Sequence, residues 1–417
     1  MPAGFFWLLA AQFCSGLADH AVLIVAIAYL QEQQHPLWWA PLLKFAFTWS
    51  YVLLAPVAGA WADAVPKQRV MAQMNALKAV AVLALVAGLQ PLLAFALLGL
   101  GAALYAPAKY GWITESVPGR LLVAANGWAE VSVVLSLLLG TALGGWWVSP
   151  MWRLPLDGAW ANLLGPVCPP TALLPAFGVV LALYAVAAWC NGRIPARAAR
   201  RPWRTDDWRQ LWPRFWRDNR RLWRDPLGGL SLAVTTSFWA IGALMQVAML
   251  RWAEQRLGLP LDRAAYLQAT VALGVIAGAG WVAHRVALVR AWRVLPAGVA
   301  MGLLLAVGVQ LTSTPWAVGI LMLLGFLGGV LVVPLNALLQ YRGHRLLQPG
   351  QSIAIQGFNE NAGVLLSTAL LAAALRADVP LVPLLTALGL MLSASMAALW
   401  LVTRQWRADR PTKPTSE

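Results

Sequence analysis

The chain has 417 residues, of which 60% are hydrophobic and only 11% are charged, and its formal net charge is +15. A soluble domain carries about 25% charged residues, so this composition excludes an ordinary soluble protein. Long apolar runs such as LLAFALLGLGAAL at 92–104 also exclude a transmembrane β-barrel, whose segments alternate in polarity. The sequence therefore predicts an all-α integral membrane protein.

Twelve apolar segments are long enough to cross a bilayer as helices, which takes about 20 residues each. In chain order they are expected at 5–30, 40–62, 69–90, 92–112, 122–147, 172–193, 228–252, 265–283, 295–312, 316–339, 352–375 and 380–402. An even number of spans places both termini on one side of the membrane.

Most Lys and Arg residues fall in the loops on one side, including eleven arginines from Arg193 to Arg224. Cytoplasmic loops carry such an excess, so we expect the termini and the central loop in the cytoplasm. The net charge is then a consequence of topology, and binding of nucleic acid is the weaker explanation.

The central loop divides the chain into a six-span half at 1–193, a linker at 194–227, a second six-span half at 228–403 and a cytoplasmic tail at 404–417. The linker interleaves arginine with tryptophan. This pattern fits a helix lying on anionic lipid, and it equally fits a plain tether.

Short similarities recur in order in the two halves. GAWAD at 59–63 and GWVAH at 280–284 follow the second and eighth spans, and NGWAE at 126–130 and QGFNE at 356–360 open the fifth and eleventh spans. Such recurrence indicates two halves in the same orientation, the parallel-repeat arrangement of major facilitator transporters.

Asp19 lies near the middle of the first span. A charge at the bilayer centre costs about 2.5–3.5 kcal/mol on insertion scales, so we expect it to face a cavity as a substrate-binding residue. The alternative is a structural partner to a buried cation. Lys78, deep in the third span, is expected to pair with a neighbour.

Lys109 lies at the inner end of the fourth span, two residues after Pro107. We expect Pro107 to break the helix there and to free backbone carbonyls. Lys109 is then either a substrate-binding cation or a side chain that reaches the interface.

Two polar pairs occupy equivalent places in the fifth and eleventh spans, Asn126 with Glu130 and Gln356 with Glu360. Each pair is spaced i, i+4 and so shares one helical face. These pairs either line a cavity or clamp helices, and Asn336 in the tenth span is a further candidate for the lining.

Gly59 lies near the end of the second span, and Asp63, Lys67 and Arg69 follow it at a cytoplasmic loop. We expect these residues to form a charge latch that changes with conformation. The four histidines lack metal-ligand spacing and no Walker A sequence is present, so we expect no catalytic residue, no metal, no cofactor and no enzymatic activity.

Several segments resemble the bacterial lysophospholipid transporter family of the major facilitator superfamily. They are AQF at 11–13, GLADHAVL at 16–23, YAPAKYG at 105–111, VVPLNALLQ at 332–340 and AIQGFNEN at 354–361. The resemblance implies a flippase-type importer. Such a protein moves lysophosphatidylethanolamine from the outer to the inner leaflet of the inner membrane, where a partner acyltransferase and acyl-carrier-protein synthetase restores the second chain.

On this resemblance Asp19 would pair with the ammonium of the headgroup, and Lys109 or Arg251 with its phosphate. Asp19→Asn is expected to leave folding intact and to abolish transport. Two departures stand out: His20 replaces the family's asparagine, and Gln246 replaces an arginine of the seventh span. Segment 149–171 is longer and richer in proline than expected, and we assign it no function.

Two alternatives stay open at the level of sequence. The first is a proton-coupled antiporter for drugs or small solutes that uses Asp19 as its proton carrier. The second is a non-transporting membrane subunit that scaffolds an acyltransferase through the linker. A monomer is expected, because one chain already holds both halves.

Overall fold

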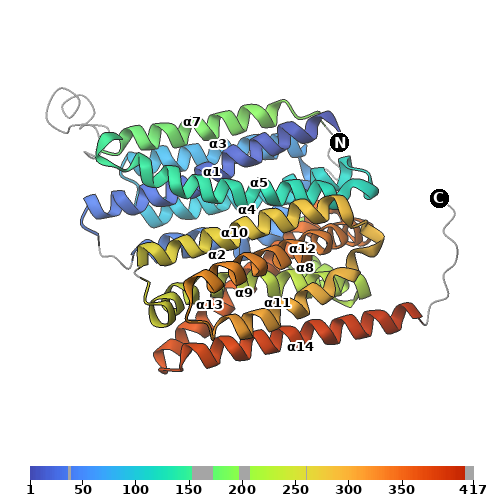
Figure 1. Cartoon of the computed structure of the whole chain (residues 1–417). Helices are drawn as coiled ribbons and strands as arrows, with labels where there is room; N and C mark the ends of the chain where they lie inside the picture. The colour runs from blue at the N-terminus through green and yellow to red at the C-terminus, as the bar shows by residue number, and fades with distance from the viewer. Residues whose placement is uncertain (36–38, 153–171, 197–206, 260, 409–417) are drawn as a thin grey trace. The chain divides into compact units, whose positions relative to one another are not determined.

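The computed structural model describes the chain except for residues 36–38, 153–171, 197–206, 260 and 409–417. Over the described residues the regular structure is helical, and twelve helices are long and apolar enough to cross a membrane. In chain order (Figure 1) they are α1 (Ala3–Glu32), α2 (Trp39–Ala64), α3 (Lys67–Val86), α4 (Pro91–Ser116), α5 (Leu122–Trp147), α7 (Leu174–Gly192), α9 (Pro226–Leu257), α10 (Leu261–Arg285), α11 (Leu295–Gly308), α12 (Thr314–Leu346), α13 (Pro349–Arg376) and α14 (Leu381–Ala408). The expected twelve spans are confirmed.

Among the described residues a further α-helix, α8 (Asp207–Arg224), lies in the linker between α7 and α9. It is too polar to cross a membrane and is absent from the twelve candidate spans. The side of the membrane on which α7 ends and α9 begins is called the linker side below.

Proline and its neighbours define several helix starts. Pro91, Pro226 and Pro349 each stand at the first position of a helix, where the missing N–H leaves no bond unmade. At α9 the N-cap carboxylate of Asp225 accepts a hydrogen bond of 2.7 Å from the amide of Gly228, which satisfies one of the free amides of the first turn.

The expectation that Pro107 breaks the fourth span is wrong. Pro107 lies inside α4, which runs without interruption from Pro91 to Ser116. A proline removes a single backbone hydrogen bond, and transmembrane helices tolerate it because packed neighbours satisfy the freed group. Lys109 is therefore a residue of a continuous helix.

By their contacts the residues group into two compact units. Unit 1 comprises 1–118, 132–222 and 340–361, and unit 2 comprises 119–131, 223–339 and 362–417. Each unit thus includes a short segment from the other half of the sequence, and the domain boundaries expected at 193 and 228 stay a prediction. Most of segment 149–171, part of the linker and the end of the tail lie outside the described residues.

Within unit 1, α7 packs against both α1 and α3, and α4 packs against α2 and α3. The apolar core between these helices includes Val25, Leu85, Leu98, Phe177 and Tyr184, all at most 1% exposed. Figure 1 shows α1, α3 and α7 side by side. This packing brings polar residues of three distant helices to one place.

Within unit 2, α11 packs against α14. Gly302 allows the close approach, because a Cβ at that position would lie 2.5 Å from the carbonyl oxygen of Gly389. A second apolar core lies around Trp252, Leu305 and Leu385. The indole N–H of Trp252 donates to the carbonyl of Val309 at 2.9 Å, so its polar atom is satisfied inside the core.

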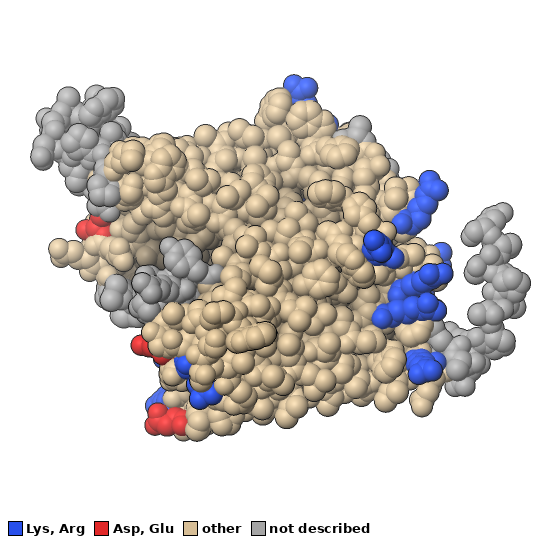
Figure 2. Space-filling model, viewed as in Figure 1, with Lys and Arg blue, Asp and Glu red and all other residues tan. Residues whose placement is uncertain are grey.

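Charge is confined to the helix ends on the face drawn in Figure 2. Lys and Arg gather toward one end of the helices, and the middle of this face carries neither sign of charge. An uncharged band between charged ends suits a surface that faces hydrocarbon.

Candidate functional site

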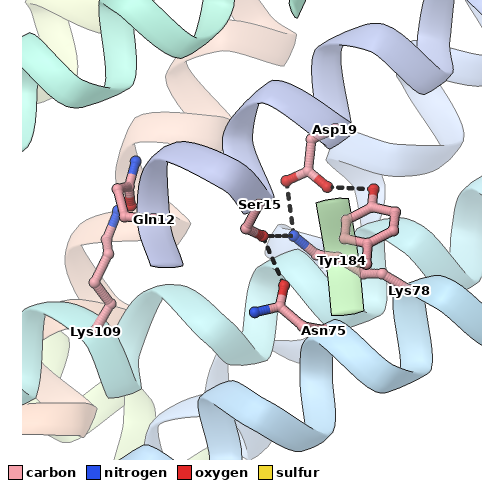
Figure 3. Close-up of polar contacts among 7 residues, drawn as sticks. All are labelled: Gln12, Ser15, Asp19, Asn75, Lys78, Lys109 and Tyr184. Atoms are coloured by element: carbon pink, nitrogen blue, oxygen red, sulfur yellow. Dashed lines mark hydrogen bonds and ion pairs between the residues drawn. The ribbon is translucent and has the colours of Figure 1, made fainter. Parts of the chain in front are cut away.

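A buried network of charged and polar groups surrounds Asp19 in unit 1 (Figure 3). The Nζ of Lys78 donates to Asp19 Oδ2 at 2.7 Å, and the hydroxyl of Tyr184 donates to Asp19 Oδ1 at 2.7 Å. Lys78 also donates to Ser15 Oγ at 3.2 Å, and that hydroxyl donates to Asn75 Oδ1 at 2.7 Å. Each charge has an opposite charge and hydrogen bonds, which is the condition for burying an ion pair.

Three helices supply these five residues. Ser15 and Asp19 stand one turn apart on α1, Asn75 and Lys78 stand one turn apart on α3, and Tyr184 comes from α7. The helix periodicity of about 3.6 residues sets each pair on one face, and the packing of α7 on both neighbours brings the phenol to the carboxylate.

Exposure differs between the two charged partners. The side chain of Lys78 is 1% exposed, whereas that of Asp19 is 18% exposed. The ammonium is therefore enclosed by protein, and part of the carboxylate can be reached from outside. The Lys78 Nζ also lies 5.5 Å and 5.7 Å from the ring centroids of Tyr105 and Tyr184, which adds cation–π attraction.

This pairing changes the expected effect of neutralising Asp19. The sequence-based expectation was that Asp19→Asn leaves folding intact. In the structure that change strands an ammonium that is 1% exposed, and removing one partner of a buried pair is strongly destabilising. The expected pairing of Lys78 with a neighbour is present, and the alternative of a structural partner to a cation gains support.

Lys109 of α4 contacts the face of α1 that carries Ser15 and Asp19. It is 7% exposed, its Nζ donates to Gln12 Oε1, and its Nζ lies 4.1 Å from the ring centroid of Tyr110. Gln12, Ser15 and Asp19 are spaced i, i+3, i+7 and so share one face. Figure 3 shows Gln12 and Lys109 beside the Asp19 network.

Three of the four expected latch residues form a second cluster in unit 1. The carboxylate of Asp63 accepts hydrogen bonds from the amides of Gly350 at 2.9 Å and Gln351 at 3.0 Å. These amides open α13, where free N–H groups and the helix dipole favour an anion. Gly59 permits the contact, because a Cβ there would lie 2.8 Å from the Cα of Gln351.

Lys67 completes this cluster. Its Nζ lies 3.8 Å from Asp63 Oδ1 and 3.0 Å from Glu115 Oε1 of α4, and the three side chains are between 3% and 6% exposed. Arg69, by contrast, is exposed. Glu115 went unnoticed in the sequence, although it ends a span next to a basic loop.

The remaining candidates divide between the units. Gln356 donates to Glu360 Oε1 at 2.8 Å within α13 in unit 1, so the i, i+4 pair is a direct hydrogen bond. Unit 2 holds Asn126 and Glu130, each 4% exposed, and Asn336, which is 7% exposed.

Gln246 and Arg251 lie toward the end of α9. Both are exposed, and the carbonyl of Gln246 accepts a hydrogen bond of 2.9 Å from Gln268 Nε2. α9 continues to Leu257, six residues beyond Arg251.

Sequence reasoning missed Gln12, Ser15, Asn75 and Tyr184. A signal existed for Gln12 and Ser15, because they continue the face of Asp19 at helical spacing inside an apolar span. Tyr184 gave no such signal, since its partner Asp19 is 165 residues away in the sequence.

Comparison with known proteins agrees with this architecture. Residues 8–368 match the family model of the Major Facilitator Superfamily. The E. coli fucose:proton symporter FucP has the same fold, with a TM-score of 0.73 over 96% of this chain and 98% of that one, at 14% identity.

Two other proteins are much more similar to this chain in sequence. The protein named lysophospholipid transporter LplT from Yersinia enterocolitica is 37% identical over 92% of this chain and 90% of its own length. The protein of that name from an Enterobacter species is 35% identical over 95% of this chain and 94% of its own. The chain therefore belongs to the major facilitator superfamily and, within it, to the family of the LplT lysophospholipid transporters.

Proposed function

We propose that this multi-pass membrane protein transports lysophospholipids, with lysophosphatidylethanolamine as the main substrate, from the outer to the inner leaflet of the bacterial inner membrane. The observation that carries the proposal is the 37% identity to a lysophospholipid transporter over nearly the whole of both chains. The buried pair of Asp19 and Lys78 gives the proposal a chemical basis.

The substrate headgroup carries one ammonium and one phosphate. Asp19 and Lys78 present the complementary charges at 2.7 Å from each other. We propose that the headgroup exchanges with this internal pair, its ammonium going to Asp19 and its phosphate to Lys78. Such an exchange replaces one ion pair by two and leaves no net charge in the membrane.

Lys109 is proposed as a second cation for the phosphate. Its Nζ donates to Gln12, which lies on the same face of α1 as Asp19. Glu130, Glu360, Asn336, Gln246 and Arg251 are proposed to line the path of the headgroup in other conformations. A polar path is needed by the headgroup alone, because the single acyl chain can stay in lipid between helices.

Asp63, Lys67 and Gly59 are proposed to hold α2 against the start of α13 in one conformation and to release it in another. A carboxylate at a helix N-terminus suits this role, because its bonds to Gly350 and Gln351 are directed and are lost together when the helix moves. Arg69 is proposed to keep the linker side positive.

We further propose that both termini and the linker face the cytoplasm, on the basis of the Lys and Arg asymmetry. The protein works as a monomer, and it delivers its product to an acyltransferase and acyl-carrier-protein synthetase that restores the second chain.

Uptake of labelled lysophosphatidylethanolamine by membrane vesicles tests the proposal. Wild-type vesicles are expected to accumulate the lysolipid without any acyltransferase. Accumulation only when an acyltransferase is present would instead favour a scaffold. Indifference to lysolipid together with a steep dependence on the proton gradient would favour an antiporter for another solute.

A further inference from the structure

Helix α8 has three distinct faces. At about 100° per residue, Leu211, Phe215 and Leu222 fall on one side of the helix, and all three are at most 4% exposed. This face is therefore buried, and the helix is held in place by its apolar side.

The buried face of α8 packs on α13. The ring of Phe215 lies 5.3 Å from that of Phe358 in an edge-on contact. Beside it, Asn359 Nδ2 donates to Asn219 Oδ1 at 3.0 Å. An aromatic contact and a hydrogen bond between the same two helices fix the rotation of α8 about its own axis.

A second face carries tryptophan. Trp212, Trp216 and Trp223 fall within about 40° of one another on the helix, and they are 47%, 50% and 42% exposed. Trp216 also packs edge-on against Phe358, with ring centroids 5.4 Å apart, and the three half-exposed indoles form one apolar stripe.

The third face is basic. Arg217, Arg220, Arg221 and Arg224 are exposed and fall about 110° from the centre of the tryptophan stripe. Burial raises the pKa of the nearby Asp218 carboxyl, while Arg214, Arg221 and Arg217 act to lower it. Burial outweighs the arginines at this carboxyl, and the basic character of the face rests on its four exposed arginines.

The position of α8 in the chain identifies what covers the tryptophan stripe. α8 ends at Arg224 and the spanning helix α9 begins at Pro226, so the stripe ends, at Trp223, three residues from the start of a membrane-spanning helix. Indole rings favour the membrane interface, and guanidinium groups bind phosphate with two hydrogen bonds.

We propose that α8 is a docking surface for anionic phospholipid on the linker side. In this arrangement Trp212, Trp216 and Trp223 enter the interface and the arginines bind the phosphates of the same leaflet. Because the buried face of α8 is joined to α13 at Phe358 and Asn359, lipid bound at α8 also restrains that part of α13.

Native mass spectrometry of the full chain in detergent, with added phosphatidylglycerol or phosphatidylcholine, tests this proposal. Wild type is expected to retain phosphatidylglycerol preferentially. The variant Arg217→Gln/Arg220→Gln/Arg221→Gln is expected to lose that preference. Its affinity for phosphatidylglycerol is expected to fall by a factor of about ten or more. The matched control Arg285→Gln/Arg290→Gln/Arg293→Gln removes three exposed charges elsewhere and is expected to keep it.

Photocrosslinking then locates the lipid. When the full chain is placed in phospholipid vesicles, benzoylphenylalanine at position 212 is expected to crosslink to the lipid acyl chains. The same probe at position 217 is expected to crosslink to them much less. Equal loss of lipid in both triple variants, or equal crosslinking at both positions, would overturn the proposal. Crosslinking of position 212 to another protein instead of lipid would also overturn it.

Discussion

The ion pair of Asp19 and Lys78 allows a quantitative test by a double-mutant cycle. Removing one partner of a buried pair costs about 3–5 kcal/mol of stability. Asp19→Asn leaves the 1% exposed ammonium with Ser15 and an amide oxygen, so we expect about 3 kcal/mol. Lys78→Gln leaves a carboxylate that is 18% exposed and still bonded to Tyr184, so we expect a smaller loss of about 2 kcal/mol.

The double variant carries no stranded charge. We therefore expect its loss of stability to be smaller than the sum of the two single losses by about 2 kcal/mol or more. The assay is thermal unfolding of each purified variant in detergent, followed by lysolipid uptake at equal amounts of folded protein.

Uptake separates a functional pair from a structural one. If the headgroup exchanges with the pair, the double variant is at least as stable as Asp19→Asn and still fails to transport. Recovery of uptake along with stability would refute the exchange, because the two charges would then serve folding alone. Strict additivity of the two losses would refute the pairing itself.

Three further predictions concern neighbouring groups. Tyr184→Phe removes one hydrogen bond to a carboxylate, worth about 1.5–3 kcal/mol, and is expected to lower the unfolding temperature and to slow uptake without abolishing it; unchanged stability would contradict the bond. Asp63→Ala removes the cap of α13, at a cost of about 0.5–2 kcal/mol, and is expected to speed hydrogen exchange of the first amides of that helix; unchanged exchange would mean that the cap contributes little. Lys109→Gln is expected to reduce lysolipid uptake, whereas the control Lys44→Gln, at an exposed lysine, leaves uptake near wild type; equal effects would assign Lys109 no special role.

The positions of the spans could be predicted because about 20 consecutive apolar residues carry a strong signal. Local pattern also located Asp19, since a carboxylate in such a run stands out. Its partners were not predictable in the same way. Tyr184 is joined to it only through the packing of α7 on α1 and α3.

Pro107 shows a different limit of prediction from local sequence. A local rule predicts a helix break, whereas the surrounding helices keep α4 continuous. Likewise, the charge pattern located Asp63 near the end of the second span, where the structure has it in the last turn of α2 and not in a loop, but its partner at the start of α13 is 287 residues away. Contacts between residues so far apart in the chain follow from tertiary packing, and the spacing of residues in the sequence does not indicate them.

The most direct test is uptake of labelled lysophosphatidylethanolamine by liposomes that contain only the purified chain. Transport in this system, with competition by unlabelled lysolipid and none by a free fatty acid, is the result that we predict. Absence of uptake by folded wild-type protein, with the membrane energised and without an acyltransferase, would contradict the proposed function.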